Sequence, residues 1–175
     1  MTPYELARRS VWIFAKAVDY CSEEEIQSGE ANIHARIERA DLLIAMLDDW
    51  LNNLPVEFGP IPKQPSDACH DFQPLWIHPP AFGKPRSLME SRAYLLIFQG
   101  VSMQFHYSAR ILILLHKPSL GGLPGHIVRQ KRLKEAVDTI CGIALALSDA
   151  ASSLVSSQCR FIGILRPMKQ LHDRC

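Results

Sequence analysis

Apolar residues recur at alternating spacings of four and three positions between residues 33 and 54. An α-helix has 3.6 residues per turn, so residues at these spacings share one face. The members of this apolar stripe are Ile33, Ile37, Ala40, Ile44, Leu47, Leu51 and Leu54. Arg36 and other charged residues fall off the stripe, and Pro55 disfavours a helical conformation in the residue before it. The pattern therefore predicts a helix over residues 33–54 that buries the stripe.

A helix is also predicted at the start of the chain. Thr2 can cap it, Pro3 suits the first helical position, and Glu5 completes a capping box. This helix should run to about Cys21. The side expected to cover the core comprises Val11, Trp12, Phe14, Ala15 and Val18.

A shorter element is expected next. Ser22 and Glu25 repeat the capping pattern, but Gly29 follows soon after. Residues 22–29 are therefore predicted to form a turn or one short helical turn.

Two long helices are predicted in the second half of the chain. A capping box at Ser87 and Glu90 opens a helix from about Leu88 to His116, which Pro118 stops. This helix is apolar on nearly every side, as is typical of the buried centre of a helical domain. After a turn over residues 118–125, a last helix should run over residues 127–156. Its predicted inner face comprises Val137, Ile140, Ile143, Ala144, Leu147, Ala151 and Leu154.

A Pro-rich segment, residues 55–86, separates the second and third of the four main helices. Most of the 12 prolines lie there, so few backbone donors remain for regular structure. Large apolar residues, Trp76 among them, alternate with the prolines, which favours a strap packed over the helices rather than a solvated linker. If the Trp76 ring is buried, its replacement by Ala should cost roughly 3 kcal/mol.

The fold class predicted from these patterns is all-α, because no strand signal competes with the helical ones. A chain of 175 residues is expected to form one domain. We divide it into an N-terminal helix and turn (residues 1–29), a helical region (residues 30–161) and a short tail (residues 162–175).

Composition narrows the function classes. A formal net charge of +1 argues against a strong basic field and hence against tight nucleic-acid binding. Five cysteines without a C-x-x-C pair predict neither a disulfide framework nor a structural zinc site, and they suit a reducing, intracellular compartment. The apolar runs are too short to span a bilayer, and no signal-peptide pattern is present.

Two groups of residues resemble metal ligands. Asp48 and Asp49 could hold Mg²⁺ against a diphosphate, although two adjacent carboxylates on a helix also suit a solvated face. Cys69, His70 and His78 could bind Zn²⁺, although their spacing matches no tight ligand pair. We assign no metal site, cofactor or catalytic residue from these patterns.

Two further groups could bind a ligand. His106 and Arg110 share a helix face and, with His116, could line a polar pocket or be satisfied within the core. A basic run at the start of the last helix could contact phosphate or direct nuclear import, or form a solvated face. The run comprises Arg129, Lys131, Arg132 and Lys134. No nucleophile–base motif or phosphate loop is present, so a non-enzymatic function is expected.

Four segments in order resemble fungal-specific transcription factors of the zinc-cluster family. Residues 47–61 are similar to that family's passage from a long helix through Trp to Pro and Phe. Residues 72–77 (Phe-Gln-Pro-Leu-Trp-Ile) resemble its Phe-Pro strap, and residues 114–118 (Leu-Leu-His-Lys-Pro) end a long apolar helix. Residues 140–144 resemble its Ile-Cys-Gly-Ile helix. The resemblance spans roughly residues 30–161.

The resemblance implies a piece of the regulatory, or middle-homology, region of such a factor. The family's Cys-rich zinc cluster, which binds DNA, is absent here, so zinc and DNA would belong to a missing N-terminal domain. The chain is then expected to be a nuclear, non-enzymatic regulatory domain in fragment or truncated form, which binds protein partners or self-associates through an exposed apolar patch. Alternatives are a stand-alone interaction or dimerisation module, a small helical ligand-binding protein, or a metal-dependent enzyme.

Overall fold

The computed structural model describes residues 3–30, 32–55, 86–119, 122–146, 157–159 and 162. Almost all of these residues are α-helical, and no strand occurs among them, so the predicted all-α class is confirmed. Two predictions fall outside the described residues: the packed strap with Trp76, and the end of the last helix beyond residue 146.

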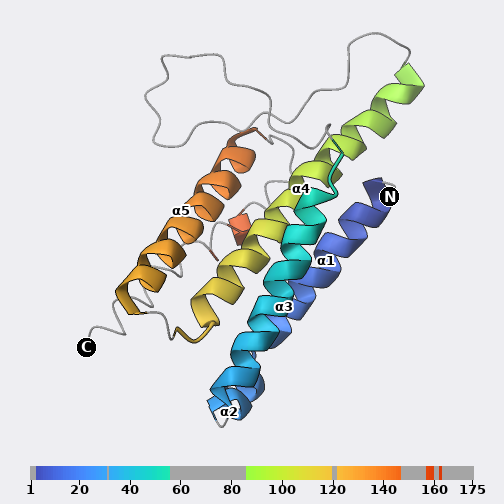
Figure 1. The fold of residues 1–175 in the computed structure, drawn as a ribbon. Helices are drawn as coiled ribbons and strands as arrows, with labels where there is room; N and C mark the ends of the chain where they lie inside the picture. Colours follow the sequence, from blue (N-terminus) through green and yellow to red (C-terminus); the bar gives the residue numbers. More distant parts are fainter. Residues whose placement is uncertain are drawn as a thin grey trace, which may run out of the picture.

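The described part of the chain has five long or medium helices, α1 (Pro3–Tyr20), α2 (Glu23–Glu30), α3 (Ile33–Asn52), α4 (Arg86–His116) and α5 (Gly122–Ala146), and a short helical segment at residues 157–159. Figure 1 shows α4 lying between α5 on one side and the antiparallel pair α1 and α3 on the other, with α2 at the end where α1 and α3 are joined. Helix α4 packs against α1, α3 and α5. It is therefore the centre of the fold.

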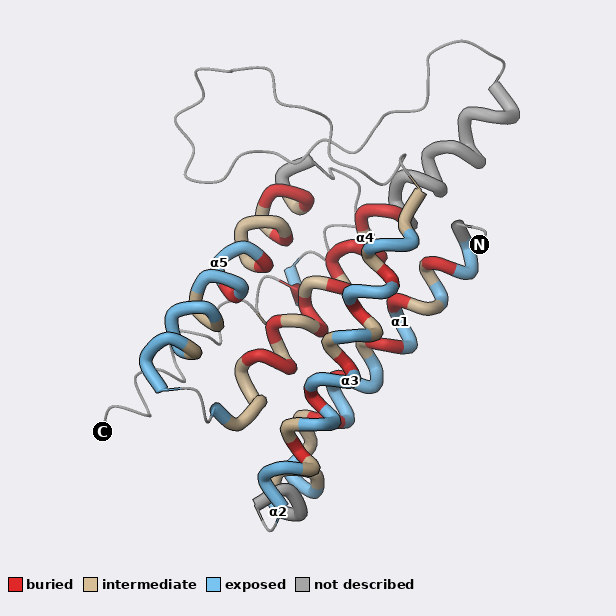
Figure 2. The backbone as a smooth tube through the Cα atoms, viewed as in Figure 1, coloured by how far each residue is buried: buried red, intermediate tan, exposed pale blue. Residues whose placement is uncertain are grey.

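The core consists of two clusters that share α4. One cluster joins α1, α3 and α4 and includes Ile143 of α5, and the other joins α4, α5 and Cys159. Along residues 99–116 of α4 no residue is exposed, in line with the prediction from its all-round apolar pattern (Figure 2). Because the two clusters lie on different sides of α4, the outer helices leave a groove on the molecular surface, which is described below.

The face that α1 buries differs from the predicted one. Its buried residues are Leu6, Ser10, Ile13, Ala17 and Tyr20. Val11, Trp12 and Val18, which were expected to cover the core, are about half exposed, with Trp12 at 50%. Ala15 is exposed and Phe14 is partly buried. Apolar residues occur on both sides of α1, and α3 and α4 pack on only one of them, so the prediction of the inner face was wrong.

The buried face of α3 is rotated relative to the predicted stripe. Its buried residues are Arg36, Ala40, Leu43, Leu47 and Trp50. Only Ala40 and Leu47 belong to the predicted stripe; Ile33 is exposed, and the other members are partly buried. The helix ends at Asn52, a little before Pro55. The face turns toward α1 and α4, where Trp50 is fully buried and its indole Nε1–H donates to the Leu6 carbonyl at 2.9 Å.

The turn or single short helical turn expected over residues 22–29 is a helix of 8 residues, α2. The Ser22 hydroxyl accepts a hydrogen bond from the Glu25 backbone N–H at 3.3 Å, so the predicted capping contact forms. Asn32 caps the next helix in the same way, because its Oδ1 accepts from the Ala35 N–H at 3.0 Å. Ser22 thus caps α2 after α1 ends, and Asn32 caps α3 after α2 ends.

The two long C-terminal helices begin earlier than predicted. Helix α4 begins at Arg86 and ends at His116, before Pro118. Helix α5 begins at Gly122, whose φ of +57° suits glycine, and Pro124 lies in its first turn. Proline is tolerated there because the first helical N–H groups have no intrahelical partner. Of the predicted inner face, Ile140 and Ile143 are buried.

Candidate functional site

The acidic pair on α3 is about half exposed, and each carboxylate also pairs with an arginine of a neighbouring helix. The Asp48 carboxylate forms an ion pair with Arg110 of α4. The Asp49 carboxylate accepts a hydrogen bond from Arg9 of α1 at 2.7 Å. Adjacent residues on a helix point in different directions, so each carboxylate reaches a different neighbouring helix. Among the described residues no group of three potential ligands could hold a metal ion.

His106 lies in the core and not in a polar pocket. Its ring is fully buried and stacks on Trp50, with ring centroids 5.0 Å apart and an interplanar angle of 24°. Neither ring nitrogen has a hydrogen-bond partner among the described residues. Burial, assisted by the nearby Arg110 charge and opposed by Asp48, lowers the pKa of His106 to about 3. The imidazole is therefore neutral at physiological pH.

None of the other predicted ligand candidates among the described residues forms a hydrogen bond with the His106 ring. His116 ends α4, where its Nδ1 bonds the Leu112 carbonyl at 2.9 Å. Arg110 is held by Asp48. Cys69, His70 and His78 lie outside the described residues. Of the residues that the sequence suggested as one pocket, Arg110 therefore stays near His106, whereas His116 bonds a carbonyl of its own helix.

A buried arginine that the sequence analysis placed off the apolar stripe organises the α2 end of the molecule. Arg36 is only 7% exposed, and its guanidinium lies 4.6 Å from the centre of the Tyr20 ring. Its Nη1 donates to the Glu25 carbonyl at 2.9 Å, and its Nη2 donates to the His116 carbonyl at 3.4 Å. One side chain therefore ties α2 and the end of α4 to α3. The spacing of Arg36, Ala40, Leu43, Leu47 and Trp50 was the signal that could have revealed this position.

A second arginine reaches the same end of α4 from α5. The Arg129 guanidinium donates to the Lys117 carbonyl, and the Lys117 ammonium pairs with Asp41 of α3. Burial raises the pKa of Tyr20, and the positive charges of Arg36 and Arg129 oppose that rise. Cations are favourable here because the last carbonyls of α4 form the negative end of its helix dipole.

A groove lies between α3, the end of α4 and the first half of α5, and Asp41, Lys117 and Arg129 border it. The groove holds about 350 Å³. Its apolar lining comprises Ile37, Ile44, Leu114 and Val128. Its charged lining comprises Asp41, Lys117, Arg129 and Arg132.

The predicted basic run therefore divides into two parts. Arg129 and Arg132 line the groove. Lys131 and Lys134 do not; they form ion pairs one helical turn along α5, with Glu135 at 4.0 Å and Asp138 at 2.6 Å. The solvated face that the sequence offered as one interpretation holds for Lys131, whose side chain is 79% exposed. Of the two arginines that line the groove, Arg129 is partly buried and Arg132 is exposed.

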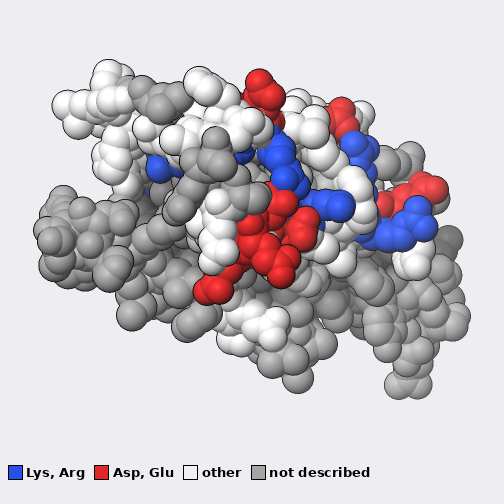
Figure 3. Space-filling view, turned by 90° about the horizontal axis from the view of Figure 1, so that it is seen from below, with Lys and Arg blue, Asp and Glu red and all other residues white. Residues whose placement is uncertain are grey.

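Charge is unevenly distributed at this end of the molecule. Figure 3 looks onto the α2 end and shows acidic side chains gathered beside Lys and Arg side chains. Helix α2 begins with three glutamates, Glu23 to Glu25, and Glu25 pairs with Arg39. Acidic residues in a first helical turn are favoured by the helix dipole.

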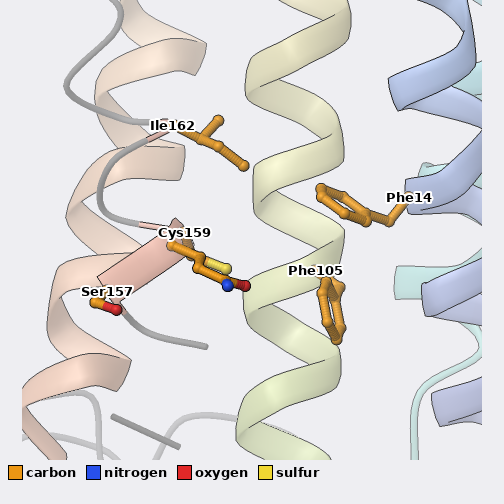
Figure 4. A pocket seen from close by; sticks show the side chains of 6 residues that line it. Phe14, Phe105, Ser157, Cys159 and Ile162 are labelled. Carbon is orange, nitrogen blue, oxygen red and sulfur yellow. The ribbon is translucent and has the colours of Figure 1, made fainter. Parts of the chain in front are cut away.

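A second hollow lies on the other side of α4. It holds about 440 Å³ and is mainly apolar, and it is lined by Phe14, Phe105, Cys159 and Ile162 together with two polar residues. Figure 4 shows Phe14 projecting from α1 toward α4, while Cys159 and Ile162 approach α4 from the other side. Phe14 and Phe105 are 5.1 Å apart between ring centroids. Burial raises the pKa of the Cys159 thiol, so it is not an activated nucleophile.

No protein-family model, curated protein or solved structure matches the chain. In the ranges that the structure describes, no helix has the length and apolarity needed to cross a membrane. Any role of the groove beside Arg129 and Arg132 must therefore be inferred from its lining residues and their contacts.

Proposed function

We propose that the chain is a non-enzymatic helical regulatory domain of a fungal, nuclear transcription factor of the zinc-cluster family, in which a separate zinc-cluster domain binds DNA. The observation that carries the non-enzymatic part is the use of the candidate chemical groups in helix packing. Asp48 pairs with Arg110, Asp49 pairs with Arg9, and His106 stacks on Trp50. The transcription-factor part rests on the order of the four sequence segments across residues 30–161.

A stand-alone interaction module is the second candidate, and the outer face of α1 favours it. Tyr4, Val11, Trp12 and Val18 are all between about half and three-quarters exposed. Exposed apolar side chains on one helix suit a contact with another protein surface, including a second copy of this chain.

The proposal is tested by fusing residues 1–175 to an unrelated DNA-binding domain in a yeast reporter strain. A regulatory domain should change reporter output relative to the DNA-binding domain alone. The fusion carrying Trp50→Ala, which removes the centre of the core, should lose this effect, whereas the Trp12→Ala fusion should keep it. Unchanged output with the wild-type fusion would contradict a regulatory role.

DNA binding supplies an independent check. With a net charge of +1, the chain itself should bind duplex DNA weakly and without sequence preference. A mobility-shift assay at physiological salt measures this. Tight, sequence-selective binding would contradict the proposal that DNA recognition belongs to a separate domain.

A further inference from the structure

The groove between α3 and α5 carries more positive than negative charge. Lys117 is balanced by Asp41 across the groove. In the described part of the chain, no carboxylate pairs with Arg129 or Arg132, although both line the groove. Arg36 does not line the groove, but it donates to the His116 carbonyl, next to the Lys117 carbonyl that Arg129 bonds.

The dipole of α5 does not explain these two cations, and the negative end of α4 favours only Arg129, which bonds the Lys117 carbonyl. Arg129 and Arg132 lie in the first half of α5, where the helix dipole gives no advantage to positive charge. Burial lowers the pKa of Arg129, so its position costs solvation that the single bond to the Lys117 carbonyl offsets only in part. By contrast, Lys131 and Lys134 each form an ion pair with a carboxylate on the outer face of α5.

The rest of the groove is apolar. Ile37 and Ile44 of α3 lie on one side, Leu114 of α4 contributes to the floor, and Val128 of α5 lies on the other side with its side chain about half exposed. A small anion would use the arginines but leave this apolar surface in water. An occupant that uses both must carry apolar groups beside carboxylates.

We propose that this groove binds an acidic, amphipathic segment of a partner protein. Apolar side chains of that segment lie on Ile37, Ile44 and Val128, and its carboxylates pair with Arg129 and Arg132. The planar guanidinium is suited to this role because it binds a carboxylate through two parallel hydrogen bonds. The inference deepens the proposed role as an interaction domain, but it does not require membership of the transcription-factor family.

The test measures binding of a fluorescently labelled amphipathic peptide, with Glu on one helical face and Leu on the other, to the full chain by anisotropy. Arg132→Glu should weaken binding by about tenfold or more, since it places a like charge beside the peptide carboxylates. Lys131→Glu is the matched control, because it makes the same charge change on the same helix outside the groove. Rising salt should weaken binding to the wild-type chain.

A second matched pair tests the apolar part. Ile127 and Val128 are adjacent and similarly exposed, at 59% and 52%, but only Val128 lines the groove. Val128→Ser should weaken peptide binding several-fold, and Ile127→Ser should not. Both residues are largely solvent-exposed, so neither change threatens folding, and circular dichroism confirms that each variant is helical.

Four outcomes overturn the proposal: no peptide binding, equal effects of the groove and control variants, equal binding of a peptide with Lys in place of Glu, or full displacement by inorganic phosphate. A dimer in light scattering that Arg132→Glu dissociates also overturns it, by assigning the groove to a second copy of the chain. Failure here with an active reporter fusion would reject the groove alone. Peptide binding with a silent reporter fusion would reject the regulatory role alone.

Discussion

The buried imidazole of His106 makes the stability of this protein depend on pH in a defined direction. In the folded chain the pKa of His106 is lowered to about 3, mainly by burial, from an ordinary value of 6.5. Between these two values the unfolded chain binds a proton that the folded chain does not. Stability is therefore highest above the unfolded pKa and falls as pH decreases.

The size of this effect follows from proton linkage. Each unit of pH within the window changes the free energy of unfolding by about 1.4 kcal/mol. In the unfolded chain, His106 begins to bind its proton near its ordinary pKa of 6.5. The free energy of unfolding therefore decreases by about 2 kcal/mol between pH 7 and pH 5. In urea denaturation this corresponds to a decrease in midpoint of about 1 M.

The variant His106→Leu isolates the contribution of this residue. Leucine removes two ring nitrogens that have no partner among the described residues, so the change should cost little stability at pH 7. The wild-type chain should then lose about 2 kcal/mol more than the variant between pH 7 and pH 5. Subtracting the two curves removes the contributions of the other six histidines.

Urea denaturation followed by circular dichroism at several pH values measures this difference. If the free energy of unfolding changes with pH in the same way for the wild-type chain and for His106→Leu, the reasoning is refuted. If the variant does not fold, NMR titration of the His106 ring in the wild-type chain tests the same point. An imidazole that titrates near its ordinary pKa in the folded state would show that it is not desolvated as the stack on Trp50 implies.

Three further predictions concern packing. Trp50→Ala should lower the free energy of unfolding by about 4 kcal/mol, because the ring is fully buried and its Nε1–H donates to the Leu6 carbonyl. A decrease in the free energy of unfolding no larger than that of a substitution at an exposed site would contradict the place of Trp50 in the core. Trp12→Ala, at a half-exposed site on α1, should change it by only about 0.5 kcal/mol in the same denaturation experiment. Asp48→Asn and Asp49→Asn should each cost about 1 kcal/mol or less, and calorimetry with Mg²⁺ should give no binding signal that these variants abolish.

The sequence by itself determined the class of fold and most helix ends, because these depend on neighbouring residues. Pro118 cannot continue a helix, and Ser22 caps the helix that follows it. The apolar pattern of α4 required partners on several sides, and no residue from 99 to 116 is exposed, although polar residues such as Gln104 and Ser108 are buried there too. The start of α5 was missed because Gly122 and Pro124 are read as turn residues, although both are tolerated in a first turn.

Only the tertiary structure decided which face each outer helix buries. Helix α1 has apolar residues on two sides, and the choice between Ile13 and Trp12 depends on where α3 and α4 lie. Arg36 is buried because carbonyl groups at Glu25 and His116, remote from it and from each other in sequence, meet its guanidinium. The groove also depends on the tertiary structure. Arg129 and Arg132 line it, whereas Lys131 and Lys134 form ion pairs along α5, and the local sequence does not predict which of the four basic residues face α3 and α4.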